Sequence, residues 1–137
     1  MAYTGGDCVE VVITSATLGS LRLDPKGSED VEVDFGGYVN ADSDDSVTGS
    51  GTNILVKNRK RWSVPVPPCG WSKEPDTLEQ LQLFADDTNE QTFVFTFIDG
   101  SVFKGTGAIV GDIKGNKNAA TINSFKAAGG GKLERIA

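Results

Sequence analysis

An aromatic stretch within residues 92–110 constrains the fold more than any other segment of this sequence. Phe93, Phe95 and Phe97 recur at every second position, which is the spacing that places side chains on one face of a β-strand. Asp99-Gly100 then interrupts the apolar run with a dipeptide that suits a tight primed turn. A second β-like pattern follows the turn. The stretch therefore predicts a β-hairpin that serves as scaffold, since none of its side chains is chemically reactive.

The rest of the sequence reads as short strands separated by turns, and 17 glycines with 5 prolines support that interpretation. A chain of 137 residues can bury one core, so we expect a single domain over residues 1–137. Pro65, Pro67 and Pro68 cannot donate to a strand ladder, which predicts that their segment forms an edge or leaves the sheet. Further strands are expected at residues 9–15, 21–24, 31–35, 38–39, 54–57, 61–66, 120–127 and 133–136.

One short helix is predicted at about residues 77–85. Asp76 and Glu79 have the spacing of a capping box just after a proline, and Thr77 with Gln80 offers an alternative register. An apolar face follows at helical spacing, formed by Leu78, Leu81 and either Phe84 or Ala85. The helix is therefore expected to pack on the flank of the β-structure.

Residues 40–52 form the clearest loop, because they are acidic, small and rich in glycine. Loops of this length in a compact domain are mobile or functional. Three of its carboxylates could ligate Ca²⁺, but the loop lacks a closing glutamate and a fixed turn glycine. A solvated acidic loop is therefore the preferred interpretation. Its notable residues are Asp42, Asp44, Asp45, Val47, Gly49 and Gly51.

Charge alternates in blocks along the sequence. Residues 1–56, 57–73, 74–99 and 100–137 carry net charges of −8, +5, −7 and +4. One explanation is pairing of opposite charges across strands within one chain. The other is that complementary patches dock copies of the chain on one another in a fixed orientation.

A basic cluster is formed by Lys57, Arg59, Lys60 and Arg61, and Trp62 follows it directly. Bases beside an aromatic residue resemble a small nucleic-acid patch. The total charge of −6 opposes phosphate binding elsewhere on the chain. A contact between subunits is therefore the preferred role of this cluster.

No catalytic set is evident, and we expect neither enzymatic activity nor a metal or cofactor. The sequence contains no histidine, which removes the commonest general base. The glycines at 105, 107 and 111 do not have the spacing of a phosphate-binding loop, and bulges or close backbone approaches explain them better. Cys8 and Cys69 lie far apart without a CxxC pair, so two reduced thiols are preferred over a bond between them or across subunits.

The first residues contain no basic region followed by an apolar stretch, and no apolar run approaches the length that crosses a bilayer. We therefore expect a soluble chain made in the cytoplasm, with no membrane partner.

The order of these segments resembles the major tail tube proteins of tailed bacteriophages. The resemblance rests on the glycine-punctuated β-pattern, the long acidic loop after an early hairpin, the helix opened by residues 75–79, the aromatic hairpin, and the closing segments 121–126 and 129–134. It covers most of the chain and depends on segment order rather than on one motif. Inner tubes of contractile injection machines and type VI secretion systems are similar.

This resemblance implies a β-sandwich or open barrel with a flanking helix, assembled as hexameric rings that stack into a hollow tube in the virion tail. The 42–51 loop would reach the next ring, and Glu10, Glu32 and Asp34 are the candidates for lining the channel. A negative bore repels phosphates, so DNA and the tape-measure protein could pass without sticking. A sheath, baseplate and tail terminator are the other implied partners.

A second hypothesis is a β-sandwich binding module that recognises a glycan or a protein. It would use Trp62, Trp71 and Tyr38, placed on loops. An enzyme is the third and weakest hypothesis, because no nucleophile lies beside a base.

Overall fold

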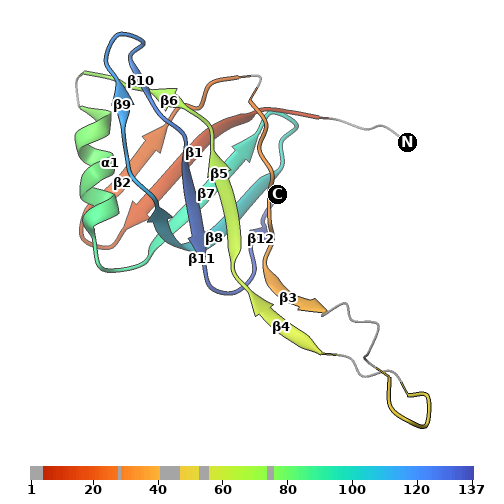
Figure 1. Cartoon of the computed structure of the whole chain (residues 1–137). Helices are drawn as coiled ribbons and strands as arrows, with labels where there is room; N and C mark the ends of the chain where they lie inside the picture. The colour runs from red at the N-terminus through yellow and green to blue at the C-terminus, as the bar shows by residue number, and fades with distance from the viewer. Residues whose placement is uncertain (1–4, 28, 41–46, 53–55, 74–75) are drawn as a thin grey trace.

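The computed structural model describes residues 5–27, 29–40, 47–52, 56–73 and 76–137. Antiparallel strands dominate this part of the chain, and one short helix accompanies them (Figure 1). The predicted all-β-dominated class with a flanking helix is confirmed.

The main sheet has seven strands. Six of them follow the order β2-β1-β7-β8-β11-β5, and the seventh, β12, pairs with β8 at residues 103 and 104, before the part of β8 that pairs with β11. A three-stranded sheet, β6-β10-β9, and a two-stranded sheet, β3-β4, complete the fold. The bounds are β1 Cys8–Ser15, β2 Gly19–Leu23, β3 Gly37–Asn40, β4 Lys57–Lys60, β5 Trp62–Val66, β6 Cys69–Gly70, α1 Thr77–Asp86, β7 Gln91–Phe97, β8 Val102–Val110, β9 Gly115–Asn116, β10 Thr121–Ile122, β11 Phe125–Gly129 and β12 Glu134–Arg135.

The aromatic hairpin is confirmed as β7 and β8, but its turn differs from the prediction. Gly100 N donates to Phe97 O at 3.0 Å, and Phe97 N donates to Ser101 O at 2.9 Å. Gly100 has a φ of 93°, whereas Asp99 does not have a positive φ. The connection is therefore a three-residue loop with one left-handed glycine, and not the two-residue primed turn that Asp-Gly suggested.

The core lies where the curved sheet brings β5 across β7. The side chain of Trp62 is fully buried, with 0% exposure, and its ring centroid lies 5.9 Å from that of Phe93 and 6.2 Å from that of Phe95 in edge-to-face contacts. Its indole Nε1 donates to the carbonyl oxygen of Thr106 at 3.1 Å. Trp62 thus joins the two sides of the sheet through packing and a hydrogen bond.

Two glycines of β8 permit this close packing. A Cβ at Gly105 would lie 2.7 Å from Cε2 of Trp62, and a Cβ at Gly107 would overlap the carbonyl oxygen of Ala128 on β11. These glycines therefore allow close approach, as the sequence indicated, and they do not form a phosphate-binding loop.

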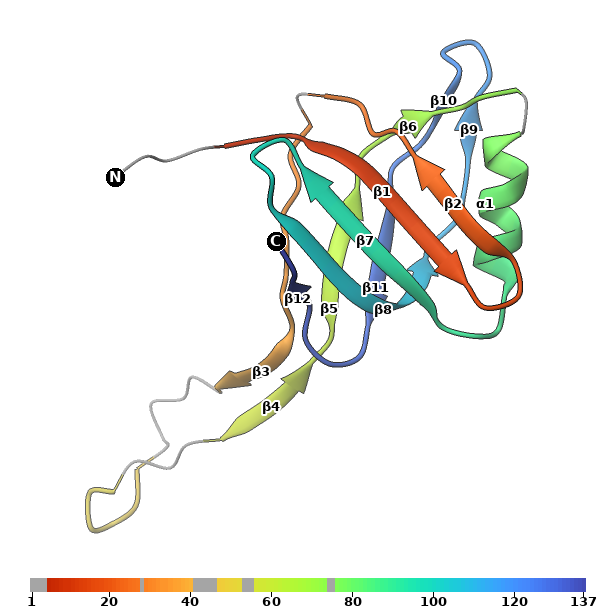
Figure 2. The same ribbon diagram turned by 180° about the vertical axis from the view of Figure 1, so that it is seen from behind.

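Irregular backbone closes the sheet into an open barrel. Beyond β2 and β5, Lys26 N donates to Pro68 O at 2.8 Å and Gly70 N donates to Asp24 O at 3.0 Å. On the other side of β5, Asp34 and Ser63 exchange two backbone hydrogen bonds of 2.9 and 3.0 Å. Figure 2 shows the barrel from behind, with the strands crossing it diagonally.

The prediction of a strand at residues 31–35 is wrong. Within it, Asp34 forms an isolated bridge with Ser63, and the remaining residues belong to no strand. Val31 and Val33 are partly buried and pack against the core. The alternation in the sequence therefore reflects one buried side of an irregular segment rather than a strand ladder.

The strand predicted at residues 120–127 is divided in two. Ala120 belongs to a turn and has a φ of 50°, and Asn123 and Ser124 separate β10 from β11. Of the strand expected at 54–57, residues 54 and 55 lie outside the described residues, and β4 begins at Lys57. The edge position expected from the prolines is confirmed, because β5 is the last strand in the sheet order.

The helix begins where the capping pattern placed it. The Asp76 Oδ1 atom accepts from the backbone nitrogens of Leu78 and Glu79 at 3.1 and 3.3 Å, which satisfies donors that the first helical turn leaves free. Leu81 and Phe84 are buried in the core. The helix lies at one end of the molecule, beside β2 and β9 (Figure 1).

Candidate functional site

The most distinctive surface is a two-stranded arm formed by β3 and β4, residues 37–40 and 57–60. Its register runs from the pair Gly37 and Lys60 to the pair Asn40 and Lys57. The arm projects away from the barrel, and residues 47–52 lie beyond its end (Figures 1 and 2). Every residue of β4 is exposed. An isolated two-stranded hairpin is marginally stable in water, so contact with a binding partner would stabilise the arm.

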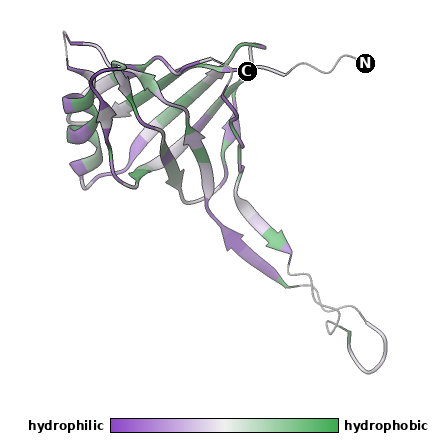
Figure 3. Cartoon of the chain, turned by 45° about the horizontal axis from the view of Figure 1, so that its top comes forward, coloured by the Kyte–Doolittle hydropathy of each residue, from purple (hydrophilic) through white to green (hydrophobic). Residues whose placement is uncertain are grey.

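One face of the arm combines an aromatic ring with bases. Tyr38, Asn40, Lys57 and Arg59 share this face, because alternate residues of paired strands point the same way. Tyr38 is 63% exposed, and the guanidinium carbon of Arg59 lies 6.0 Å from the centre of its ring. Val39 lies on the opposite face and is 45% exposed. Figure 3 shows β4 in the hydrophilic colour and apolar colour toward the end of β3.

The root of the arm is fixed by an ion pair. Lys60 Nζ lies 2.7 Å from Asp34 Oδ2. Hydrogen bonding from Lys60, followed by that from the backbone nitrogen of Gly36, lowers the pKa of the Asp34 carboxyl below its ordinary value. Lys57, Arg59 and Arg61 form no ion pair with any residue that the structure describes. The predicted basic cluster is therefore divided into one neutralised lysine and three exposed bases.

Trp62 is not available for nucleic-acid stacking beside the basic cluster. Trp62, the aromatic residue next to the cluster in sequence, points into the core and is inaccessible. The prediction that Trp62 lies on a loop is wrong, because it begins β5. Trp71 is half-buried and donates from Nε1 to Asp76 Oδ1 at 2.8 Å, with Lys117 Nζ 4.6 Å from the centre of its ring. Of the three aromatic residues proposed for a binding module, Tyr38 is the exposed one.

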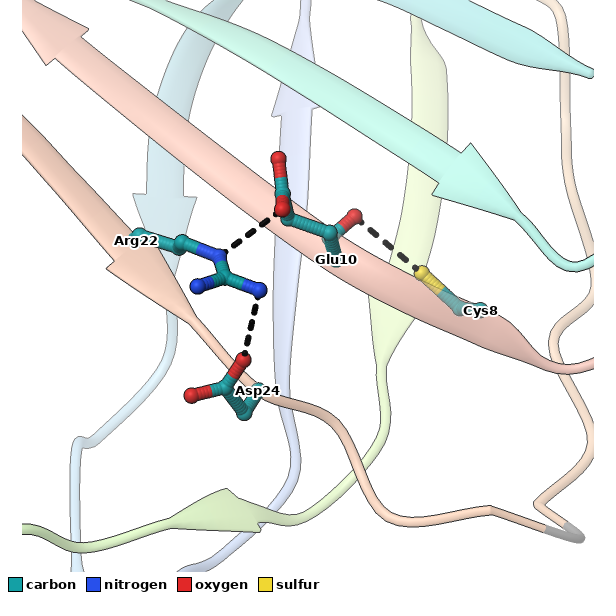
Figure 4. A network of polar contacts seen from close by, with 4 residues as sticks. All are labelled: Cys8, Glu10, Arg22 and Asp24. Atoms are coloured by element: carbon teal, nitrogen blue, oxygen red, sulfur yellow. Dashed lines mark hydrogen bonds and ion pairs between the residues drawn. The ribbon is translucent and has the colours of Figure 1, made fainter. Parts of the chain in front are cut away.

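The three candidate channel residues do not lie together. Glu32 and Asp34 line one shallow hollow of about 630 Å³ beside Lys126. Glu10 lies on β1, where Arg22 Nε is 2.8 Å from its Oε2 atom, and Arg22 also reaches Asp24 at 3.4 Å (Figure 4). The acidic candidates thus occupy two sites, each of which includes a base.

The predicted 40–52 loop is described in part. Asp42, Asp44 and Asp45 lie outside the described residues. Beyond them, Thr48 and Thr52 close a tight turn through a 2.8 Å backbone hydrogen bond, and Gly51 has a φ of 89°. Val47 and Gly49 are exposed in the same segment.

A second surface, at the helix end of the molecule, was not anticipated from the sequence. Leu18 and Leu83 are 42% and 53% exposed, and they line a small hollow of about 150 Å³ with Ser20, Gln80 and Phe84. We call this hollow the leucine dimple. The available signal was the position of Leu83, which is out of phase with the buried face of Leu81 and Phe84.

The two thiols are withdrawn from solvent. Cys8 and Cys69 are free and buried. Burial raises the pKa of Cys8 to about 11 and that of Cys69 to about 12. Both cysteines therefore act as small core residues.

Among the described residues, no group of three or more acidic or cysteine side chains is arranged to hold a metal ion. In the same part of the chain, no helix has the length and apolar character that a bilayer crossing requires. No protein-family model matches the sequence, and no curated protein matches it at a significant level.

Proposed function

We propose that this chain is the structural subunit of a phage tail tube, which assembles into hexameric rings that stack around a hollow passage for DNA. The observation that carries the proposal is the projecting arm, whose aromatic, aliphatic and basic side chains are left exposed by the chain's own barrel. The exposure of these side chains on a projecting element supports a role of the arm in protein contacts.

The position of the arm favours assembly from identical copies. It extends from the end of the molecule opposite α1 (Figures 1 and 2). A copy that offers the arm at one end and receives a partner elsewhere makes a heterologous contact, which generates rings or open filaments. An arm that engages a further copy along the axis then joins one ring to the next.

The overall charge suits a conduit for nucleic acid. The chain carries a net charge of −6, and acidic surfaces repel phosphate, whereas basic ones bind it through counterion release. In this proposal the exposed bases of the arm form contacts between subunits and are therefore not available to bind phosphate. DNA and a tape-measure protein then pass through the tube as cargo. A sheath, baseplate and tail terminator would be the flanking partners in the virion tail.

The test is electron microscopy of the purified full chain at increasing concentration, together with sedimentation velocity. Rings and tubes of uniform diameter are expected. A monomer at every concentration and salt condition would refute the proposal.

A variant lacking residues 42–51 separates stacking from folding. Because polar residues at a loop tip contribute little to the core, its thermal unfolding midpoint should match that of the full chain, while stacked tubes should be lost. Tubes that form as before would show that the loop does not join the rings.

A further inference from the structure

We propose that the arm of one subunit docks in the leucine dimple of another, with Tyr38 packed against Leu18 and Leu83. Arg59 and Lys57 then face the acidic residues around the dimple. This inference rests on the proposed self-assembly and names the surface that receives the arm.

Each of the two surfaces presents exposed apolar side chains. Leu18 lies in the turn between β1 and β2, Leu83 is exposed on α1, and buried Phe84 also lines the hollow. Tyr38 is the aromatic residue of β3 and β4, and it is 63% exposed. Tyrosine and arginine, together with tryptophan, are enriched among the residues that anchor interfaces, and such anchors pack into pockets of the partner.

The charges around the two surfaces are opposite. On α1, Glu79 and Asp86 stand four residues before and three residues after Leu83, so they flank it on the same side of the helix. Asp87, the C-cap residue, follows directly. Residues 74–99 contain seven acids and no base. The helix side of the dimple thus belongs to a block of net charge −7, and β4 of the arm belongs to the most positive block, at +5.

Arg22, the base on β2, does not weaken this complementarity of charge between the arm and the dimple. Arg22 is held by Glu10 at 2.8 Å and by Asp24 at 3.4 Å on the outer face of the sheet (Figure 4). On the arm, Lys60 is held by Asp34. Arg59 and Lys57 therefore remain as the arm's available cations, next to Tyr38 on one face. Charge complementarity of this kind fixes partner and register.

The contact must join different copies. The arm and α1 lie at opposite ends of the molecule in both views (Figures 1 and 2), so the arm does not reach its own dimple. Docking therefore has a direction, and every subunit can give one arm and receive one.

A charge exchange tests the docking. Arg59→Glu and Glu79→Lys should each raise the concentration needed for assembly roughly tenfold or more, measured by sedimentation velocity. The double variant restores an opposite-charge pair in reversed order and should recover most of the assembly. Lys114→Glu, an equal charge reversal at an exposed site outside the arm, is the matched control and should assemble like the wild type.

Leu83→Glu provides an independent test of the apolar contact. It should abolish assembly, whereas Gln82→Glu, which adds the same charge to the neighbouring helical position, should not. Both positions are exposed, so circular dichroism should show unchanged folds. If the wild type assembles but Leu83→Glu also does so and the charge exchange gives no rescue, the inference is overturned while the proposed function stands. If the wild type never assembles, both fall.

Discussion

Lys60 and Asp34 join the root of the arm to the barrel. Their side chains meet at 2.7 Å, and the backbone of Asp34 is in turn bonded in both directions to Ser63 on β5. One lysine of the arm is thus bound to a residue that is itself fixed on the edge of the sheet. The ion pair therefore connects the barrel end of β4 to the edge of the main sheet.

We expect the contribution of this ion pair to stability to disappear in acid. The pKa of Asp34 is lowered in the folded state, so its stabilising effect is complete above its unfolded pKa of about 3.9 and is lost as the pH falls through the lower folded value. Asp34→Asn should lower the urea midpoint at neutral pH, and the difference from wild type should shrink as the pH drops below about 4.

Asp30, which is exposed and forms no ion pair among the described residues, serves as the control. Asp30→Asn should leave the urea midpoint at neutral pH close to that of the wild type. A constant difference between Asp34→Asn and wild type at every pH would contradict the assigned role of the carboxylate.

The close approach of β8 and β11 predicts that Gly107→Ala destabilises the fold. The added methyl group would overlap the carbonyl oxygen of Ala128, and the atoms that it meets are backbone atoms of Ala128 and Gly129, which cannot turn aside as a side chain can. Overpacking of this kind costs about 1–3 kcal/mol. Gly130→Ala, where a Cβ meets no atom within 4 Å, is the control. Chemical denaturation of both variants measures the effect, and equal midpoints would disprove the packing argument.

Two leucines on α1 should differ sharply in their contribution to stability. Leu81 is fully buried and Leu83 is 53% exposed. Leu81→Ala should therefore lower the free energy of unfolding by about 2–5 kcal/mol, whereas Leu83→Ala should change it by no more than about 0.5 kcal/mol. Equilibrium unfolding in urea distinguishes them. A large loss at Leu83 would mean that this residue belongs to the core and does not form a docking surface.

Asp76 is expected to act through hydrogen bonds that asparagine can also accept. The Asp76 Oδ1 atom accepts from two backbone nitrogens of α1 and from the indole of Trp71. Asp76→Ala should lower the thermal midpoint and shift the tryptophan fluorescence, while Asp76→Asn should retain most of both properties, since the two residues are equivalent N-caps. Equal losses in the two variants would indicate that charge, rather than hydrogen bonding, is the important property.

Local patterns predicted much of this fold. The spacing of Phe93, Phe95 and Phe97 placed β7, and Asp76 with Glu79 placed the start of α1. Both signals depend on neighbours in the sequence. The alternation at 31–35 does not form a strand, because alternation reports burial on one side, and this happens in irregular backbone as well as in strands.

The candidate surfaces were harder to predict, because they depend on tertiary arrangement. Lys60 and Asp34 were assigned to separate surfaces, although the barrel brings them into contact. Trp62 was considered as a stacking residue, but its position at the start of β5 turns it inward. The leucine dimple brings together Leu18 and Leu83, which lie 65 positions apart in the sequence. Periodicity within a segment carries no information about such pairings.

The burial of both native thiols makes the chain convenient for site-directed labelling. Alkylating reagents attack the thiolate, and the pKa values of Cys8 and Cys69, raised to about 11 and about 12, leave almost none of it at neutral pH. A cysteine introduced by Ser50→Cys, in the exposed turn beyond the arm, would be the single fast-reacting group. A dye attached there would report on the surroundings of the turn in solution without removal of either natural cysteine.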